Sequence, residues 1–192
     1  MKTRPYRKSK RAEDEERTRA RIVDAAEALH GSLGPSRTSI SAVAEKAGVT
    51  RATVYRHFPD DESLFLACSG QWLGRQPVPD ASTWTSYDEP TARLRAGLAD
   101  VYRYYRAGEP MISLVLRDAD AVPQRVKQAR LEQEQQWIRT LLQPFATRRR
   151  KTLRAAVAHA IAFTTWRSLC VAQGLPDKAA IELMLGMVTA SC

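Results

Sequence analysis

Apolar residues recur along most of the chain at the three- and four-residue spacing of helices that bury one side. In the first such stretch, expected over about 14–31, Ile22, Ala26 and Leu29 fall on one face. Further helices are predicted at about 39–47, 50–57, 60–75, 90–108, 111–116, 123–144, 152–173 and 177–188. Alternation typical of strands is missing, and so is a glycine-rich phosphate loop. The sequence therefore predicts an all-α fold.

Residues 39–58 read as two short helices joined by a tight turn. Thr38 or Ser39 can cap the first helix, because a hydroxyl at that position accepts a bond from an unpaired backbone N–H. Gly48 stands where a helix ends in a left-handed residue, and Thr50 can cap the second helix. A helix, a glycine-containing turn and a second helix form a helix-turn-helix unit.

The second of these helices has an inward side and a polar side. Val49, Val54 and Phe58 are expected to face inward, and no carboxylate lies between Thr50 and His57. Recognition helices place such an N-terminal half in the major groove of DNA. The candidate DNA-binding residues are Thr38, Thr50, Arg51, Ala52, Thr53, Tyr55, Arg56 and His57. The alternative is a small helical hairpin with a solvated basic face.

The motif G-V-T-R-A-T-V-Y-R-H-F, with I-x-x-V-A before it, resembles the DNA-binding domain of TetR-family regulators. The resemblance extends from Arg21 to about Cys68. It implies an all-helical homodimer that regulates transcription, usually as a repressor, and that releases its operator when a small effector binds the C-terminal domain. It also places base and phosphate contacts at Thr50, Arg51, Ala52, Thr53, Tyr55 and His57. One departure is Asp61, at a position where these regulators often carry a cation.

Charge and composition suggest how the 192 residues are organised. The net charge of +9 favours a polyanionic partner. The helix-turn-helix unit and an expected two-fold dimer together predict that this partner is double-stranded DNA with an inverted-repeat operator. Residues 1–12 are basic at the start and are predicted to be a disordered arm. Residues 13–75 form the predicted DNA-binding domain. A proline-containing loop at 76–88 opens the predicted helical ligand-binding and dimerisation domain, 76–192.

The predicted C-terminal domain is rich in aromatic residues, which could line a cavity for an apolar or aromatic effector. The candidate ligand-binding residues are Tyr102, Met111, Arg117, Trp137, Phe163 and Trp166. Aromatic residues at helical spacing also form ordinary cores, and that alternative stays open. The last two predicted helices are apolar over wide faces, so we expect them to pair with a second copy, with Ile161 and Leu185 at the interface.

The sequence gives little support to other classes of protein. The sequence offers no catalytic motif, no metal-ligand spacing and no cofactor motif. The residues considered are His30 (expected at the surface), His57, His159, Cys68, Cys170 and Cys192, the three cysteines being expected as free thiols. Without a long apolar run or a secretory signal, a cytoplasmic protein is expected. The alternatives are a dimeric ligand-binding protein without operator binding, and an enzyme whose site assembles only in three dimensions.

Overall fold

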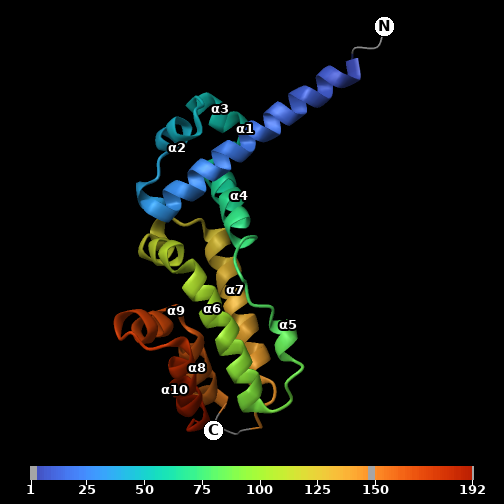
Figure 1. Cartoon of the computed structure of the whole chain (residues 1–192). Coiled ribbons are helices and arrows are strands. Elements are labelled where there is room, and N and C mark those ends of the chain that lie inside the picture. The colour runs from blue at the N-terminus through green and yellow to red at the C-terminus, as the bar shows by residue number, and fades with distance from the viewer. Residues whose placement is uncertain (1–3, 147–149, 192) are drawn as a thin grey trace. The chain divides into compact units, whose positions relative to one another are not determined.

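The computed structural model describes residues 4–146 and 150–191, which form helices joined by turns (Figure 1). These described residues include no strand, so the all-α prediction is confirmed. The chain divides into two compact units. The first comprises residues 1–75 and 110–126, and the second comprises 76–109 and 127–192.

The first unit contains four complete α-helices and parts of two more. They are α1 (Arg4–Ser32), the 3-10 turn η1 (Pro35–Arg37), α2 (Ile40–Ala47), α3 (Arg51–His57), α4 (Asp61–Leu73), the end of α6 (Pro90–Arg117), η2 (Ala119–Ala121) and the start of α7 (Gln124–Leu142). Helix α1 packs against α2 and α4, and α3 packs against α2. Ile22 and Val54 have no exposed surface in the resulting apolar core.

Helix α1 begins at Arg4, about ten residues before its predicted start. The expected disordered arm at 1–12 therefore differs from the structure over residues 4–12, while residues 1–3 lie outside the described part. Lysine and arginine are good helix formers, and Pro5 is tolerated in a first turn. An ion pair of 3.3 Å between Arg11 and Glu15, four residues apart, supports the helix.

Residues 110–126 belong to the first unit, although the sequence suggested the C-terminal domain. Arg117 Nη2 donates to Leu33 O at 2.7 Å, and Asp118 Oδ2 accepts from Ser36 N at 3.1 Å. The hydrogen bonds that Asp118 accepts from Arg117 and from Ser36 hold the pKa of its carboxyl well below its usual range. Gly34 has φ of 91°, and a side chain there would lie 2.3 Å from both Arg117 and Asp118. This junction therefore requires glycine.

Pro110 does not end a helix, so the separate helix predicted at 111–116 is wrong. Helix α6 continues through Pro110 to Arg117. A proline inside a helix removes one backbone hydrogen bond. The half-buried residues that follow, and the contacts of the Arg117–Asp118 pair, stabilise the helical continuation.

The second unit is formed by the rest of the chain. Its elements are α5 (Ala81–Trp84), most of α6 and α7, α8 (Arg150–Ile161), α9 (Phe163–Trp166), the π-helical η3 (Arg167–Ala172) and α10 (Asp177–Thr189). Helix α6 approaches α7 closely at Gly97, where a Cβ atom would lie 2.5 Å from Leu141 Cδ2. The buried Arg93 donates to Tyr87 O at 2.8 Å and to Gln143 Oε1 at 3.2 Å.

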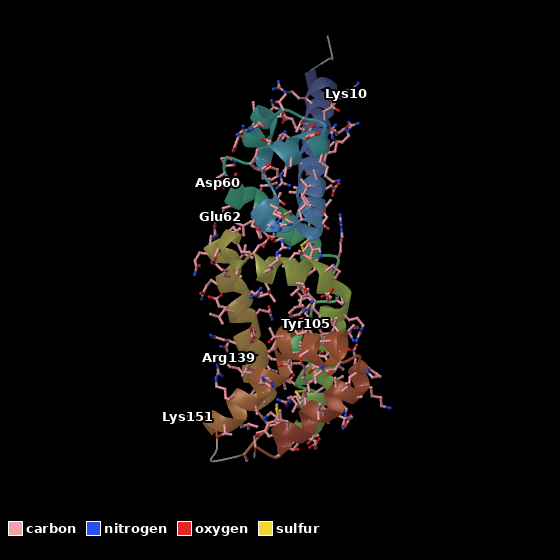
Figure 2. All side chains as sticks on the ribbon, turned by 90° about the vertical axis from the view of Figure 1, so that its left-hand side faces the viewer. Lys10, Asp60, Glu62, Tyr105, Arg139 and Lys151 are labelled. Atoms are coloured by element: carbon pink, nitrogen blue, oxygen red, sulfur yellow. The ribbon has the colours of Figure 1, made fainter. Side chains whose placement is uncertain are left out.

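The predicted continuous helix at 152–173 is broken at Ala162, whose ψ is 137°. The segments on either side are bent by 56°. The hydroxyl groups of Tyr102 and Tyr105 donate to Ala160 O at 2.9 Å and to Ile161 O at 2.8 Å. Tyr105 is labelled among the side chains in Figure 2. A helix end leaves carbonyl groups unpaired. The two tyrosines on α6 satisfy the carbonyls of Ala160 and Ile161 at this end.

No single helix in the described ranges is both long and apolar enough to cross a membrane. In the described ranges, only α8 and residues 163–172 taken together are long and apolar enough, and these two segments are bent by 56° relative to each other.

His30 is buried rather than exposed, so the expectation of a surface position is wrong. Its Nδ1 lies 3.3 Å from Cys68 Sγ, and its ring lies 4.9 Å from that of Phe65. Burial lowers the pKa of His30 to about 4 and raises that of the Cys68 thiol to about 12. Cys68 and Cys170 are free and buried, as predicted, whereas Cys192 lies outside the described residues.

We predict that His30 makes the folded state less stable in acid. Its folded pKa of about 4 is below the ordinary histidine value of 6.5, so protonation favours the unfolded chain. This contribution is complete above pH 6.5 and is lost as the pH falls to 4, by roughly 3 kcal/mol. Urea unfolding of wild type and His30→Leu at several pH values should show a smaller loss in the variant. Parallel losses in the two proteins would contradict this prediction.

Candidate nucleic-acid interface

The first helix of the helix-turn-helix unit is capped by Ser39. Its hydroxyl accepts from Ala42 N at 3.2 Å, whereas the Thr38 hydroxyl donates to Gly34 O at 2.9 Å. Of the two predicted candidates, Ser39 is therefore the cap. Gly48 ends α2 with φ of 65°, the left-handed conformation that the sequence predicted.

The turn between α2 and α3 is also held by Arg21 of α1. Its Nε and Nη2 donate to Ala47 O at 3.1 and 2.6 Å, and Nη2 also lies 3.1 Å from Gly48 O. A cation at a helix C-terminus satisfies free carbonyl groups and interacts favourably with the helix dipole. Sequence reasoning missed this role, because Arg21 lies outside the apolar stripe and no local motif links it to the turn.

Helix α3 is oriented by its buried residues. Thr50 Oγ1 accepts from Thr53 N at 3.1 Å and caps the helix. Val54 has no exposed surface and Phe58 is 3% exposed, so both face the core as predicted. With this side buried, the opposite side of α3 is open to solvent. The exposed residues there are Thr50, Arg51, Ala52, Tyr55 and Arg56.

The exposed side of α3 carries cationic and hydroxyl donors. The ion pairs found among the described residues include neither Arg51 nor Arg56. Thr53 and His57 are half-buried. His57 Nε2 is closed off from solvent and has no hydrogen-bond partner among the described residues. The structure therefore presents Arg51 and Tyr55 outward more fully than His57.

Carboxylates stand directly after α3. Asp60 Oδ1 accepts from Ser63 N at 2.7 Å and caps α4, and Asp61 follows, exposed, in the first turn. Negative charge in a first turn suits the helix dipole but repels a DNA phosphate. The basic surface of α3 is therefore bounded by acidic residues at the start of α4.

The six candidate ligand-binding residues do not all belong to one unit. Met111 and Arg117 lie in the first, and the other four lie in the second. Tyr102 and Trp166 are buried, and Phe163 lies 5.6 Å from Trp166 between ring centroids. Arg117 is occupied by its bonds to Leu33 O and Asp118.

Trp137 is 5% exposed, and its Nε1 has no hydrogen-bond partner among the described residues. Its ring lies 6.5 Å from that of Trp84 and 6.3 Å from that of Tyr104. Trp137 thus packs against two other aromatic side chains inside the second unit.

Two short helices in this arrangement, packed on α1 and α4, define a helix-turn-helix DNA-binding domain. Residues 22–68 match the family model of bacterial regulatory proteins, tetR family. The chain therefore carries a DNA-binding domain similar to that of this family over residues 22–68.

Known regulators resemble the same part of the chain. The HTH-type transcriptional regulator TtgR of Pseudomonas putida is 42% identical over 55 residues, which cover 29% of this chain and 26% of that protein. The HTH-type transcriptional regulator AcrR of Shigella flexneri is 42% identical over 56 residues, with the same shares. The match thus spans about a quarter of the length of these relatives.

A solved structure resembles nearly the whole chain. NalD of Pseudomonas aeruginosa, the secondary repressor of the MexAB-OprM multidrug efflux pump, aligns with a TM-score of 0.62. The alignment covers 93% of this chain and 97% of that one, at 22% sequence identity. At this identity the likeness concerns the fold.

We predict that Arg21→Ala destabilises the first unit. The change removes the donors to Ala47 O and Gly48 O, at a cost of about 1–3 kcal/mol in the free energy of unfolding. Arg17→Ala is the matched control, because Arg17 only pairs with Asp14 on the surface of the same helix and should cost under ~0.5 kcal/mol. Urea unfolding measures the free energy of unfolding of both variants. Equal losses would show that the bonds of Arg21 to Ala47 and Gly48 contribute no more than a surface ion pair.

Proposed function

We propose that this protein is a DNA-binding transcriptional regulator, a repressor that leaves its operator when a small effector binds. The observation that carries this proposal is the exposed side of α3. Arg51, Tyr55 and Arg56 lie on that side, and the buried Val54 fixes the orientation of the helix. The family match over residues 22–68 supports it. The relatives are regulators by name, which favours this function over an enzyme.

Base recognition is assigned to the N-terminal half of α3. Arg51 and Tyr55 lie four residues apart and therefore project from the same side of the helix. An arginine can donate two hydrogen bonds to the O6 and N7 atoms of guanine in the major groove. Thr50 and Thr53 stand beside them at the start of the helix. Hydroxyl groups and basic side chains also contact phosphates, which position the helix without reading sequence.

Dimerisation is assigned to an apolar stripe along α10 and the residue that caps its end, formed by Ala179, Leu183, Gly186 and Ala190. These residues are exposed at helical spacing, and Leu183 is 51% exposed. Val171 in η3, 47% exposed, adds to the uncovered apolar surface. Ile161 and Leu185 were predicted at this interface, but they are 0% and 3% exposed because the core of the same unit covers them.

A two-fold dimer would present two α3 helices to one face of DNA. Half-sites of an inverted repeat would then lie about one helical turn apart, roughly 34–36 Å. The effector is assigned to the second unit, whose aromatic side chains suit an apolar or aromatic molecule. By linkage, an effector that weakens operator binding is itself bound more weakly by the operator complex, by the same factor.

Selection from random DNA duplexes tests this function. The full chain should enrich an inverted repeat, and fluorescence anisotropy should show that the repeat binds more tightly than a scrambled duplex at the same salt concentration. A protein that enriches no sequence and binds all duplexes equally would instead be a helical ligand-binding protein without an operator.

We predict that Arg51→Ala relaxes specificity at one base pair of the selected operator. Loss of a bidentate guanine contact should remove about 1–3 kcal/mol of discrimination there, while other positions keep their preferences. Anisotropy titrations of single-base operator variants measure this change. Arg139→Ala, which alters an exposed arginine on α7, is the control. If Arg51→Ala weakened all duplexes by one common factor, Arg51 would contact phosphate only.

We also predict that Leu183→Glu produces monomers, because the charge would lie in the proposed apolar interface. Leu131→Glu is the matched control, since Leu131 is 49% exposed on α7, outside that interface. Sedimentation velocity at micromolar concentration should show a dimer for wild type and Leu131→Glu, and a monomer for Leu183→Glu. A monomeric wild type would refute the assigned interface.

A further inference from the structure

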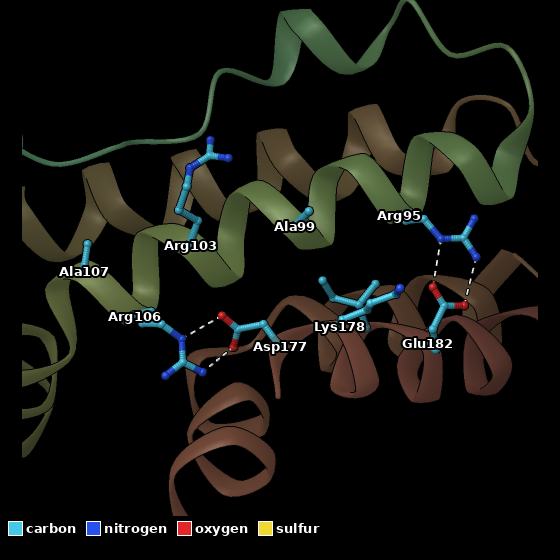
Figure 3. Close-up of a pocket in the computed structure, with 9 residues that line it drawn as sticks. Arg95, Ala99, Arg103, Arg106, Ala107, Asp177, Lys178 and Glu182 are labelled. Carbon is cyan, nitrogen blue, oxygen red and sulfur yellow. Dashed lines mark hydrogen bonds and ion pairs between the residues drawn. The ribbon is translucent and has the colours of Figure 1, made fainter. Parts of the chain in front are cut away.

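A groove of about 670 Å³ lies in the second unit, between α6 and α10 (Figure 3). Its volume is in the range of sites that hold drug-sized molecules. The groove is open to solvent on one side, and it is lined by residues of α6 and by the first two turns of α10. None of the residues that sequence analysis proposed for ligand binding lines it.

Two ion pairs close the ends of this groove. Arg95 donates through Nε and Nη2 to both oxygens of Glu182, each at 2.9 Å. Arg106 Nε donates to Asp177 Oδ2 at 2.7 Å. The two arginines are eleven residues apart on α6, which corresponds to ~16 Å. A planar guanidinium that donates through two nitrogens to one carboxylate keeps one orientation. The side chains at the ends of the groove are therefore preorganised.

Between the ion pairs the groove is apolar at its base. Ile181 is 7% exposed, and Ala99 on α6 is small enough to leave space over it. A larger side chain at position 99 would extend into this space. The base therefore suits the hydrocarbon part of a ligand about as long as the gap between the two ion pairs.

The groove also carries an excess of positive charge. Its lining includes four cations and two carboxylates, a net charge of +2. Lys178 lies between the two ion pairs (Figure 3), and it forms no ion pair among the described residues. It stands in the first turn of α10, where the helix dipole disfavours a cation. It also interacts electrostatically with Glu182, four residues further along the helix, and it offers an ammonium group to an anion in the groove.

We propose that this groove binds a small organic anion, with its carboxylate beside Lys178 and its apolar body over Ala99 and Ile181. Inorganic anions gain no binding energy from the apolar base of the groove, and neutral apolar molecules gain none from the ammonium group of Lys178. The groove therefore selects against both classes. The site is separate from α3, so it does not depend on the proposed DNA binding.

A natural reporter adjoins the groove. Trp166 Nε1 donates to Asp177 Oδ1 at 3.2 Å, and the guanidinium carbon of Arg106 lies 5.5 Å from the centroid of the Trp166 ring. An anion near Lys178 changes the electric field at this indole, so tryptophan fluorescence should respond to binding.

The experiment titrates the full chain, without DNA, with naphthalene-2-carboxylate and with its neutral amide. Calorimetry and tryptophan fluorescence should both show saturable binding of the carboxylate, at least about tenfold tighter than of the amide. Lys178→Gln should weaken carboxylate binding about tenfold and leave amide binding unchanged. Ala99→Leu, an exposed helical position, should abolish binding of both by filling the groove.

Lys151→Gln is the matched control, because Lys151 is an exposed lysine on α8 that does not line the groove, and it should bind like wild type. The site would be overturned by absent saturable binding, by equal affinities for carboxylate and amide, or by unchanged binding in Lys178→Gln and Ala99→Leu. A change of oligomeric state in Ala99→Leu, with unchanged binding, would show that a second copy occupies the groove. Operator binding of the free protein is measured separately, so its success or failure leaves this test unaffected.

Discussion

Burial of one side of α3 is the constraint on which the candidate interface depends. Val54 and Phe58 enter the apolar core formed with α1, α2 and α4. A short helix has little stability of its own, so this packing fixes both its position and its rotation. Once Val54 faces inward, the helical period forces Arg51 and Tyr55 outward. The polar side chains that α3 presents to solvent therefore depend on the packing of apolar side chains in the core.

Polar contacts supplement this packing at the ends of the short helices. Ser39 and Thr50 cap the starts of α2 and α3, and Arg21 binds the carbonyls at the end of α2. The two tyrosine hydroxyls at Ala160 and Ile161 have the same role in the second unit, where they satisfy carbonyls freed by the break at Ala162. In both units, side chains from a neighbouring helix complete hydrogen bonds that a helix end leaves open.

Features set by neighbouring residues could be predicted from the sequence, and features set by residues far away in the chain could not. The bounds of α2 and α3, their caps and the inward Val54 follow from local signals, namely capping hydroxyls, a left-handed glycine and helical spacing. The break at Ala162 and the role of Arg21 depend on partners far away in the chain, so no local signal marks them. Residues 110–126 group with the first unit through equally distant partners, since the contacts of Arg117 and Asp118 with Leu33 and Ser36 span more than eighty positions. Apolar residues lie on both the buried and the exposed side of α10, so the sequence pattern does not tell the two sides apart. Leu185 was therefore predicted at the interface, whereas Leu183 is the exposed residue.

The central claim is that the outward side of α3 contacts DNA. It is tested most directly by recording amide resonances of the ¹⁵N-labelled protein while its selected operator duplex is added. If α3 is the contact surface, the largest changes occur at residues 50–56, and Arg51 and Tyr55 are affected at lower DNA concentrations by the operator than by a scrambled duplex. Changes confined to other helices, with the resonances of α3 unmoved at saturation, would contradict it.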